Sequence, residues 1–385
     1  MMKSHVTYDV AIAGGGPVGL LLAIMLSRKG ISTIILDKQH RIHHHSRSVG
    51  IHPPSLHVLE QIGLQDEIIN AGVKIHQGHA MVDAGTQFGS IRFELLPEPY
   101  QFVLAIPQYR TEHILENAVR EETHATLLRG HEVYHTEERD DEITVFAKDQ
   151  NNEMTFHTRF LVGCDGKKSR VRRNAGISYH GDIYPNSYVM GDFDDNISFD
   201  NDALIFVTNN GLVESFPLPE NKRRWVVETS EDYSDKNARE TAEIINTRTG
   251  LKPDPESNSM LSNFGTERYL ASTFHKGQII LAGDAAHVLS PIGGQGMNLG
   301  WLDCDHLSRA LEAIIQSGEP ATPTLDRYSR QRRKKAEQAI KRSEFNMLLG
   351  HRNRFPGFRN FVIRQLLKAP LNRIMARRFT MAGLG

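Results

Sequence analysis

The chain has 385 residues, of which 39% are hydrophobic and 24% are charged. This composition suits a folded protein of two or three domains and excludes a disordered chain. The longest apolar run near the start, Val18 to Leu26, is shorter than the roughly 20 residues that span a bilayer, so we expect no transmembrane segment. Cys164 and Cys304 are the only cysteines, which excludes a disulfide framework and a zinc cluster. With no secretory signal at the start, we expect a cytoplasmic protein.

Charge is distributed unevenly along the chain, although the net charge is only -1. From Arg327 to Gly385 there are 16 Lys and Arg against two acidic residues. Within this tail, the stretch from Phe355 to Met381 interleaves apolar and basic residues and contains no acid. Such a stretch is able to rest weakly on an anionic membrane surface. We favour a lid or docking helix packed on the acidic body of the protein, and we expect no nucleic-acid partner.

The first forty residues have the pattern of a β-α-β unit. A short apolar run of buried-strand type covers Tyr8 to Ala13, and helical apolar spacing follows from Leu20 to Lys29. Gly30 stands where a helix-ending glycine belongs. A second apolar run, Thr33 to Leu36, predicts the next strand, which Asp37 closes.

The turn between the first strand and the helix has the spacing Gly14-x-Gly16-x-x-Gly19. In such a turn the first glycine permits a tight bend, the second lets a pyrophosphate approach the backbone, and the third lets helix and strand pack closely. Free amides at the start of the helix then bind the phosphate, and Asp37 is placed to bind a ribose hydroxyl. The motif predicts a dinucleotide site without deciding between NAD and FAD.

The middle of the chain differs, because short strand-like segments alternate there with turn residues. These segments are Ala80 to Phe93, Tyr188 to Phe193, Ala203 to Val207 and Arg224 to Glu228. They predict an antiparallel sheet inserted into the nucleotide-binding domain, whereas the chain is mostly helical from Leu299 onward. We therefore expect a discontinuous dinucleotide-binding domain (residues 1–74, 107–182 and 271–345), a substrate-binding sheet domain (75–106 and 183–270) and a basic helical C-terminal segment (346–385).

Two later segments resemble the signatures of one family. Cys164-Asp165-Gly166, with the basic run that follows it, is similar to the Asp-Gly motif of flavoprotein hydroxylases. Gly283-Asp284, with the run from Pro291 to Asn298, is similar to their second FAD signature. The chain thus resembles the class A flavoprotein monooxygenases, the FAD-dependent aromatic hydroxylases of the para-hydroxybenzoate hydroxylase type. The resemblance implies an α/β fold with a Rossmann-like FAD-binding domain, an inserted antiparallel sheet for the substrate and a helical C-terminus.

The resemblance also implies roles for individual residues. Asp284 would contact the ribityl or pyrophosphate part of FAD, and the helix that starts in Gly294 to Asn298 would direct its amides at the flavin ring. Arg170 and Arg172 are candidates for the phosphates of a nicotinamide cofactor. The positions implied to bind FAD are Gly14, Gly16, Pro17, Val18, Gly19, Asp37, Lys38, Arg47, Gln108, Asp165, Asp284, Gly294, Gly296, Met297 and Asn298.

The reaction implied by the resemblance is a monooxygenation. NADPH or NADH would reduce FAD, and a flavin C4a-hydroperoxide would transfer one oxygen atom to an aromatic, phenolic or polyketide-type small molecule. No metal site and no certain catalytic side chain are implied, and the backbone near Pro291 and Gly293 would lie between the flavin and the substrate. Baeyer–Villiger insertion into a ketone and a non-catalytic FAD-binding protein are the alternatives. The identity of the substrate, the choice of nicotinamide cofactor and the oligomeric state are left open.

The wall of the substrate pocket is less well defined by the sequence. Phe193, Phe206 and Phe216 are candidates for it because they lie on predicted strands of the inserted sheet. Tyr188, His79 and His180 are candidates for a group that helps to deprotonate a phenol. For each of these residues, an ordinary structural role is the competing interpretation.

Overall fold

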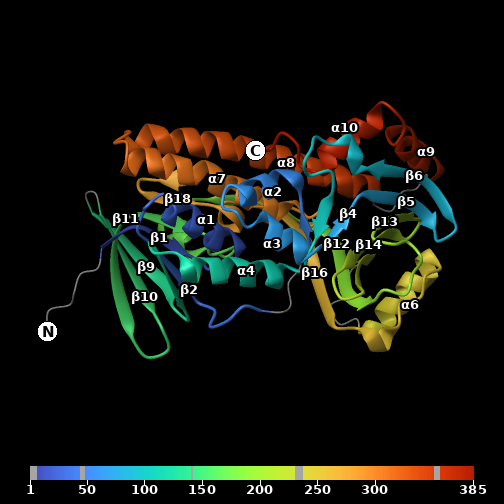
Figure 1. The fold of residues 1–385 in the computed structure, drawn as a ribbon, viewed down its shortest axis with the longest axis horizontal. Coiled ribbons are helices and arrows are strands. Elements are labelled where there is room, and N and C mark those ends of the chain that lie inside the picture. The colour runs from blue at the N-terminus through green and yellow to red at the C-terminus, as the bar shows by residue number, and fades with distance from the viewer. Residues whose placement is uncertain (1–6, 44–47, 140–141, 230–236, 351–355) are drawn as a thin grey trace.

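The structure is a computed structural model that describes residues 7–43, 48–139, 142–229, 237–350 and 356–385. It contains two large sheets, one at each end of an elongated molecule, and helices that connect them (Figure 1). The helices are α1 (Pro17–Ser27), α2 (Pro53–Glu60), α3 (Gln65–Asn70), α4 (Gln108–Glu121), α5 (Arg170–Asn174), α6 (Ala238–Thr249), α7 (Gln295–Ile315), α8 (Ala321–Gly350), α9 (Pro356–Leu366) and α10 (Leu371–Phe379). No helix in the described part of the chain is both long and apolar enough to cross a membrane.

The first sheet has a parallel core in the order β18-β11-β1-β2-β8, and β17, β10 and β9 extend it with antiparallel pairings. Its strands are β1 (Thr7–Ala13), β2 (Thr33–Asp37), β8 (Ala125–Arg129), β9 (Glu132–Arg139), β10 (Glu142–Lys148), β11 (Glu153–Gly163), β17 (His275–Lys276) and β18 (Ile279–Leu281). The apolar runs predicted as buried strands form β1 and β2, because parallel strands covered by helices are buried on both faces. Helix α1 begins at Pro17, earlier than predicted, since proline suits the first position of a helix.

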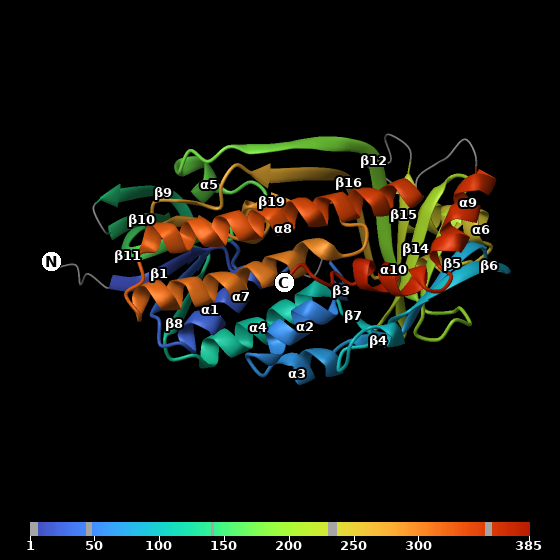
Figure 2. The same ribbon diagram turned by 90° about the horizontal axis from the view of Figure 1, so that it is seen from above.

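The second sheet has the order β19-β16-β12-β15-β14-β13-β5-β6. Its strands are β5 (Gln77–Asp83), β6 (Thr86–Arg92), β12 (Tyr179–Asp194), β13 (Ala203–Thr208), β14 (Gly211–Leu218), β15 (Lys222–Thr229), β16 (Met260–Ala271) and β19 (His287–Val288). All neighbouring pairs are antiparallel except β13 with β5. The long strands β12 and β16 run from the side of the first sheet into the second sheet (Figure 2).

The second sheet buries both of its faces. On one face an apolar cluster that includes Val213, Trp225 and Ile245 packs beneath α6. On the other face a separate cluster includes Met190, Val226 and Phe264. Because side chains alternate along each strand, the two clusters are built from adjacent residues of the same strands.

Helices and a small sheet join the two ends of the molecule. Helices α7 and α8 lie side by side along the long axis (Figures 1 and 2), while α9 and α10 pack near β6 at the far end of the second sheet. The small sheet pairs β3 (Gly50–Ile51) and β4 (Val73–Ile75) with β7 (Val103–Ala105). This arrangement directs the start of α7 toward the space between the two large sheets (Figure 2).

Candidate active site

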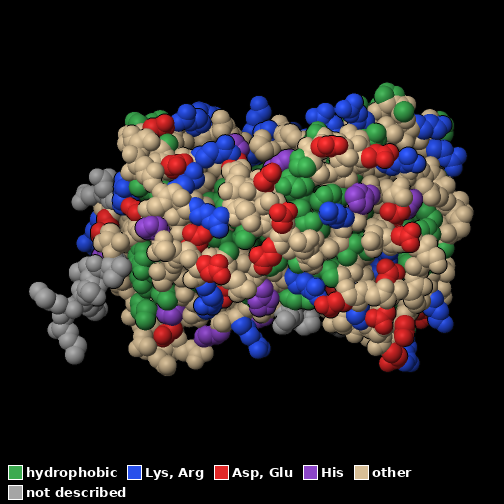
Figure 3. Space-filling model, in the orientation of Figure 1, with side chains coloured by type: hydrophobic (Ala, Val, Ile, Leu, Met, Phe, Trp, Pro, Cys, Tyr) green, Lys and Arg blue, Asp and Glu red, His purple; other side chains and the backbone are tan. Residues whose placement is uncertain are grey.

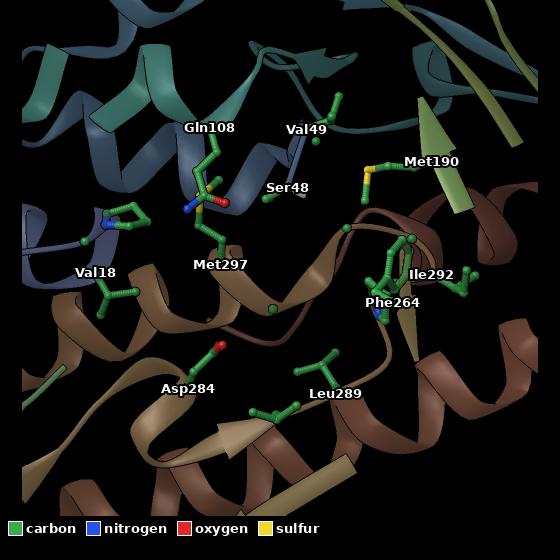
Figure 4. Close-up of a pocket in the computed structure, with 18 of the residues that line it drawn as sticks. Val18, Ser48, Val49, Gln108, Met190, Phe264, Asp284, Leu289, Ile292 and Met297 are labelled. Atoms are coloured by element: carbon green, nitrogen blue, oxygen red, sulfur yellow. The ribbon is translucent and has the colours of Figure 1, made fainter. Parts of the chain in front are cut away.

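A cavity of about 1030 Å³ extends from the glycine-rich turn after β1 to one face of the second sheet. At one end its wall comes from the turn, the end of β2, the start of α4 and the segment before α7. Val18, Gln108, Asp284 and Met297 lie at this end in the close-up (Figure 4). The other end is lined by side chains of the second sheet. The cavity therefore combines a polar groove with an apolar chamber.

The glycines of the turn differ in what surrounds them. Gly14 has a φ of +107°, and a Cβ added there would lie 2.3 Å from the carbonyl oxygen of Cys164. A Cβ at Gly19 would lie 1.9 Å from the oxygen of Gly14, whereas one at Gly16 would meet nothing within 4 Å. Gly14 and Gly19 are thus required by packing, and Gly16 leaves open space at the N-terminus of α1.

Asp37 lies at the end of β2, beside this turn. Its carboxylate accepts hydrogen bonds from the backbone N–H groups of Gly15 (2.5 Å) and Gln39 (2.6 Å). Asp37 and Lys38 both line the cavity, as does Gln108, whose amide donates to Glu112 (2.6 Å). The turn and the acid are therefore held together at the same edge of the first sheet.

Two further carboxyl groups face the cavity with unused hydrogen-bonding capacity. Asp165 accepts hydrogen bonds from the N–H groups of Arg170 (2.7 Å) and Val171 (3.2 Å) through one oxygen, and its other oxygen has no partner among the described residues. The Asp284 carboxylate points into the cavity (Figure 4), and none of the described residues donates to it. The surrounding protein raises the pKa of both groups by desolvation. Such carboxylates suit the hydroxyl groups of a ligand.

The start of α7 forms the floor between the groove and the chamber. Gly294 precedes the helix with a φ of +63°, and Pro291, Gly293, Gly296 and Met297 line the cavity with it. The positive end of a long helix dipole thus faces the cavity and favours negative charge there.

Asn298 holds this segment from behind the cavity wall. Its amide donates to the carbonyl oxygens of Gly50 and Gly294 (2.8 Å each) and accepts from the N–H of His52 (2.9 Å). The His52 ring contacts the carbonyl oxygen of Gly293 (2.9 Å), and burial lowers the pKa of His52 to about 4. His52 is therefore an uncharged part of this wall near neutral pH.

A buried charged network supports the Gly283–Asp284 turn. Asp303 accepts from His287 (2.5 Å), Arg332 (2.8 Å) and the N–H of Gly283 (3.3 Å). Burial alone would raise the pKa of Asp303, but the positive charges of His287 and Arg332 outweigh this effect and lower it. The network ties the turn to α7 and α8.

Most of the predicted site residues lie together at the cavity. Those that line it are Gly14, Gly16, Pro17, Val18, Asp37, Lys38, Gln108, Asp165, Asp284, Gly294, Gly296 and Met297. Gly19 and Asn298 lie just behind the wall, and Arg47 is outside the described residues. Arg170 reaches the cavity, whereas Arg172 is buried and donates to the carbonyl oxygens of Ala285 and Lys167.

The chamber is lined by only one of the three predicted phenylalanines. Phe216 faces the chamber, but Phe193 and Phe206 pack in the cluster beneath α6, so the prediction was wrong for these two residues. The error has a structural reason. Side chains alternate between the two faces of a strand, and both faces of this sheet are buried, so an apolar strand pattern does not show which residues face the chamber and which face α6.

The predicted proton acceptors also differ in their surroundings. His79 lines the cavity and contacts Asp202 (2.7 Å), while His180 is exposed. Burial and the charges of Glu228 and Glu214 raise the pKa of Tyr188, which therefore keeps its proton. Glu214, which is not among the predicted site residues, lines the chamber directly. The sequence signal that could have identified Glu214 is an acidic residue two positions from Leu212 and two from Phe216 on an otherwise apolar strand.

These surroundings fit a flavin dinucleotide. Open space at Gly16 suits a pyrophosphate, Asp37 suits a ribose, and the unpartnered carboxylate of Asp284 suits the hydroxyls of a ribityl chain. A protein-family model described as an FAD binding domain matches residues 7–343. The chain belongs to this family.

Relatives of this FAD-binding-domain protein are monooxygenases. An uncharacterized aromatic compound monooxygenase from Bacillus subtilis (strain 168) is 32% identical over 355 residues, covering 89% of this chain and 68% of the relative. Para-nitrophenol 4-monooxygenase from Pseudomonas sp. (strain WBC-3) is 27% identical over 333 residues, covering 84% of this chain and 82% of the relative.

Solved structures share the fold across nearly the whole chain. The p-nitrophenol 4-monooxygenase of Pseudomonas putida DLL-E4 has a TM-score of 0.89 at 24% identity, covering 98% of this chain and 99% of that one. An anhydrotetracycline hydroxylase from Streptomyces rimosus has a TM-score of 0.81 at 27% identity, covering 97% and 76%. The predicted α/β fold and the resemblance to class A flavoprotein monooxygenases are thereby confirmed. The protein is an FAD-dependent monooxygenase.

Proposed function

We propose that this monooxygenase uses NADPH or NADH and O2 to hydroxylate an apolar phenolic or polyketide-type ring. The chemistry that FAD would supply when bound is the acceptance of a hydride from the nicotinamide and the activation of O2. The apolar chamber carries the proposal, since Met190, Phe264 and Ile292 face the cavity opposite the polar groove (Figure 4). Relatives named for para-nitrophenol and for pentachlorophenol support a phenol as the substrate.

The residues of the chain bind, orient and shield the reactants in this proposal. Gly16, Asp37, Asp165 and Asp284 hold FAD along the groove, together with the other residues predicted for this role. The N-terminal amides of α7 stabilise negative charge on the reduced ring. The backbone of Pro291 and Gly293 separates the ring from the substrate, and the second sheet excludes water from the reacting atoms.

The division into domains belongs to the same proposal. Residues 1–74, 107–182 and 271–345 form the FAD-binding part, residues 75–106 and 183–270 form the substrate-binding sheet part, and residues 346–385 form the basic C-terminal segment. Free thiols at Cys164 and Cys304 support a location in the reducing cytoplasm.

Labelled oxygen tests the reaction. The FAD-loaded protein is mixed with NADPH or NADH under ¹⁸O2 and a panel of phenols, polyketides and ketones, and the products are read by mass. One labelled oxygen on an aromatic ring, with turnover stimulated by the substrate, is the expected result. Insertion beside a ketone would instead identify a Baeyer–Villiger enzyme. Failure of both nicotinamides to reduce the flavin would favour a non-catalytic FAD-binding protein.

We also propose that the outer surface of α9 and α10 contacts an anionic membrane. Phe358, Phe361 and Ile374 are between 58% and 70% exposed, and the exposed Arg364 and Arg373 accompany them. Basic and apolar side chains gather at this end of the molecule (Figure 3). Exposed aromatic and aliphatic side chains beside cations are the pattern of an interfacial helix.

The inner surface of the same helices lines the chamber through Ile363, Met375 and Phe379, and Leu367, which follows α9, lines it with them. A membrane contact on the outer surface of α9 and α10 would therefore deliver an apolar substrate to the active site. Co-sedimentation with anionic vesicles at low salt is expected, and a Phe358→Ser/Phe361→Ser variant is expected to lose it. Equal sedimentation with zwitterionic vesicles, or none at all, would contradict the proposal.

A further inference from the structure

Glu214 is a buried carboxylic acid in the apolar wall of the chamber. It lies in the middle of β14, is 4% exposed and lines the cavity. Its cross-strand neighbours are Ile205 on β13 and Val226 on β15. Along its own strand, Leu212 and Phe216 point to the same face. The carboxyl group is therefore surrounded by apolar side chains that also face the chamber.

No described residue forms a hydrogen bond or an ion pair with the Glu214 side chain. Burial raises the pKa of this carboxyl to about 7. An unpartnered buried carboxylate is costly, and native proteins normally pair such groups. The free carboxyl at the wall of a ligand chamber thus points to a partner that arrives with the ligand.

The other buried acids on the same face are already satisfied within the protein. Asp192 accepts two hydrogen bonds from Arg224 (2.6 and 2.7 Å). Glu228 accepts from the amide of Asn186 (2.6 Å) and from the N–H of Leu212 (2.9 Å). Of these acids, Glu214 is the one whose oxygen atoms are left for a substrate.

The cations beside the chamber are likewise engaged. Arg224 forms the ion pair with Asp192, and Arg359 donates to the carbonyl oxygens of Val207 (2.9 Å) and Thr208 (3.2 Å). A substrate carboxylate entering the chamber would therefore meet the carboxylate of Glu214, and like charges at close range repel strongly where water is excluded. A neutral hydroxyl group would instead supply the missing hydrogen bond.

We propose that Glu214 selects the substrate of this enzyme: its carboxylate accepts a hydrogen bond from the hydroxyl of an uncharged phenolic ring, and it excludes rings that carry a carboxylate. The hydrogen bond fixes which edge of the ring faces the sheet and therefore which carbon faces the start of α7. Glu214 acts here as a substrate-binding residue. The inference rests on the proposed function, because it presumes that the substrate is a phenol.

Ligand titration of the holoenzyme tests the inference. Phenol, anisole and 4-hydroxybenzoate are titrated at about pH 8, where Glu214 is charged and phenol keeps its proton, and the absorbance of bound FAD reports occupancy. For the wild type, we expect phenol to bind at least about 10-fold more tightly than anisole, which has no hydroxyl to donate. We also expect the wild type to bind phenol more tightly than 4-hydroxybenzoate by a similar factor.

Two substitutions separate the hydrogen bond from the charge. Glu214→Leu is expected to bind phenol and anisole within about 2-fold of each other, because the acceptor is gone. Glu214→Gln keeps an acceptor and loses the charge, so it is expected to retain the preference for phenol over anisole while its discrimination against 4-hydroxybenzoate falls. Glu228→Gln is the matched control at a neighbouring buried acid, and both ratios are expected to stay at wild-type values.

The outcomes distinguish this inference from the proposed function. If all variants incorporate labelled oxygen into phenol with the same kcat/KM and the same binding ratios, the proposed function stands and the role of Glu214 is overturned. Tight binding of 4-hydroxybenzoate to the wild type overturns that role as well. If the wild type binds no phenol at all, the role of Glu214 is overturned, and the labelled-oxygen panel of phenols, polyketides and ketones decides the proposed function separately. Stoichiometric FAD and an unchanged melting temperature confirm that each variant is folded, and a Glu214→Leu protein that unfolds leaves the Glu214→Gln result to decide.

Discussion

Two aspartates beside the Gly283–Ala285 turn, Asp284 within it and Asp303 on α7 behind it, have opposite roles. Asp284 faces the cavity with no donor among the described residues, while Asp303, just behind it, accepts three hydrogen bonds from the protein. The first is available to a ligand and the second is fully used by the fold. Substitutions at the two positions should therefore affect different quantities.

Removal of the Asp284 carboxylate should weaken FAD binding with little effect on the fold. A hydrogen bond to a charged group contributes about 1.5–3 kcal/mol, so Asp284→Ala is expected to raise the Kd for FAD by about 10-fold or more. Titration of the FAD-depleted protein by flavin fluorescence measures the change. Asp182→Ala, which removes an exposed partner of Arg268, is the control and should keep wild-type affinity. Unchanged FAD affinity in Asp284→Ala would remove this residue from the cofactor site.

Removal of the Asp303 charge should instead destabilise the protein. Asp303→Asn leaves Arg332 and His287 buried without their carboxylate, a loss of about 3–5 kcal/mol in the free energy of unfolding. Glu319→Gln, in an exposed pair with Arg327, should cost less than about 1 kcal/mol. Urea denaturation near neutral pH measures both values. A loss at position 303 no larger than that of the control would show that the network carries no stability.

The same network predicts a dependence of stability on pH. The pKa of Asp303 is lower in the folded protein than in the unfolded chain, because His287 and Arg332 outweigh the effect of burial. Its contribution is therefore present above an unfolded-state pKa of about 3.9 and is lost as the pH falls through the lowered value. The stability difference between wild type and Asp303→Asn should shrink below about pH 4. A difference that is constant or grows with acidity would refute the assignment of the pKa shift.

At the scale of elements, the β1–α1 turn contains glycines that the fold requires and one, Gly16, that only the proposed FAD site requires. Gly16→Ala is expected to leave the melting temperature of the FAD-depleted protein unchanged, since nothing lies within 4 Å of the new Cβ. FAD affinity should nonetheless fall by about 10-fold or more, because the methyl group occupies the approach of the pyrophosphate. Gly19→Ala should instead lower the melting temperature, because its Cβ would overlap the oxygen of Gly14. Equal stability losses in both variants would contradict this division.

The β-α-β unit and the second sheet show how much of the structure could be predicted from the sequence. The β-α-β unit was predictable because strand burial, helix spacing and glycine spacing are local properties of one short stretch. The choice between the two buried faces of the second sheet was not, since Phe206 and Phe216 have the same local pattern and differ only in which helix or chamber they meet. Glu214 was missed for a related reason, because its free carboxyl is defined by neighbours on two other strands.

At the scale of the whole molecule, the last residues of the chain are bound to α8. The side chains of Met381 and Leu384 are fully buried. The carbonyl oxygen of Leu384 accepts from Arg332 (2.8 Å), and that of Gly383 accepts from Lys335 (2.6 Å). Because Arg332 also binds Asp303, the C-terminal residues support the network behind the polar groove, the proposed FAD site.

Deletion of residues 382–385 should therefore affect both stability and the distant cofactor site. Exposing the Leu384 pocket costs about 1.5–3 kcal/mol, and each lost hydrogen bond adds about 1 kcal/mol. Differential scanning fluorimetry is expected to show a lower melting temperature, and the Kd for FAD is expected to rise because Arg332 is less well positioned. Gly385→Ala is the control, because it keeps the Leu384 peptide carbonyl and its added Cβ would lie at an ordinary 3.7 Å from Leu302. If the longer deletion lowers the melting temperature without changing FAD affinity, the C-terminal residues stabilise the fold but are not coupled to the groove through Arg332 and Asp303.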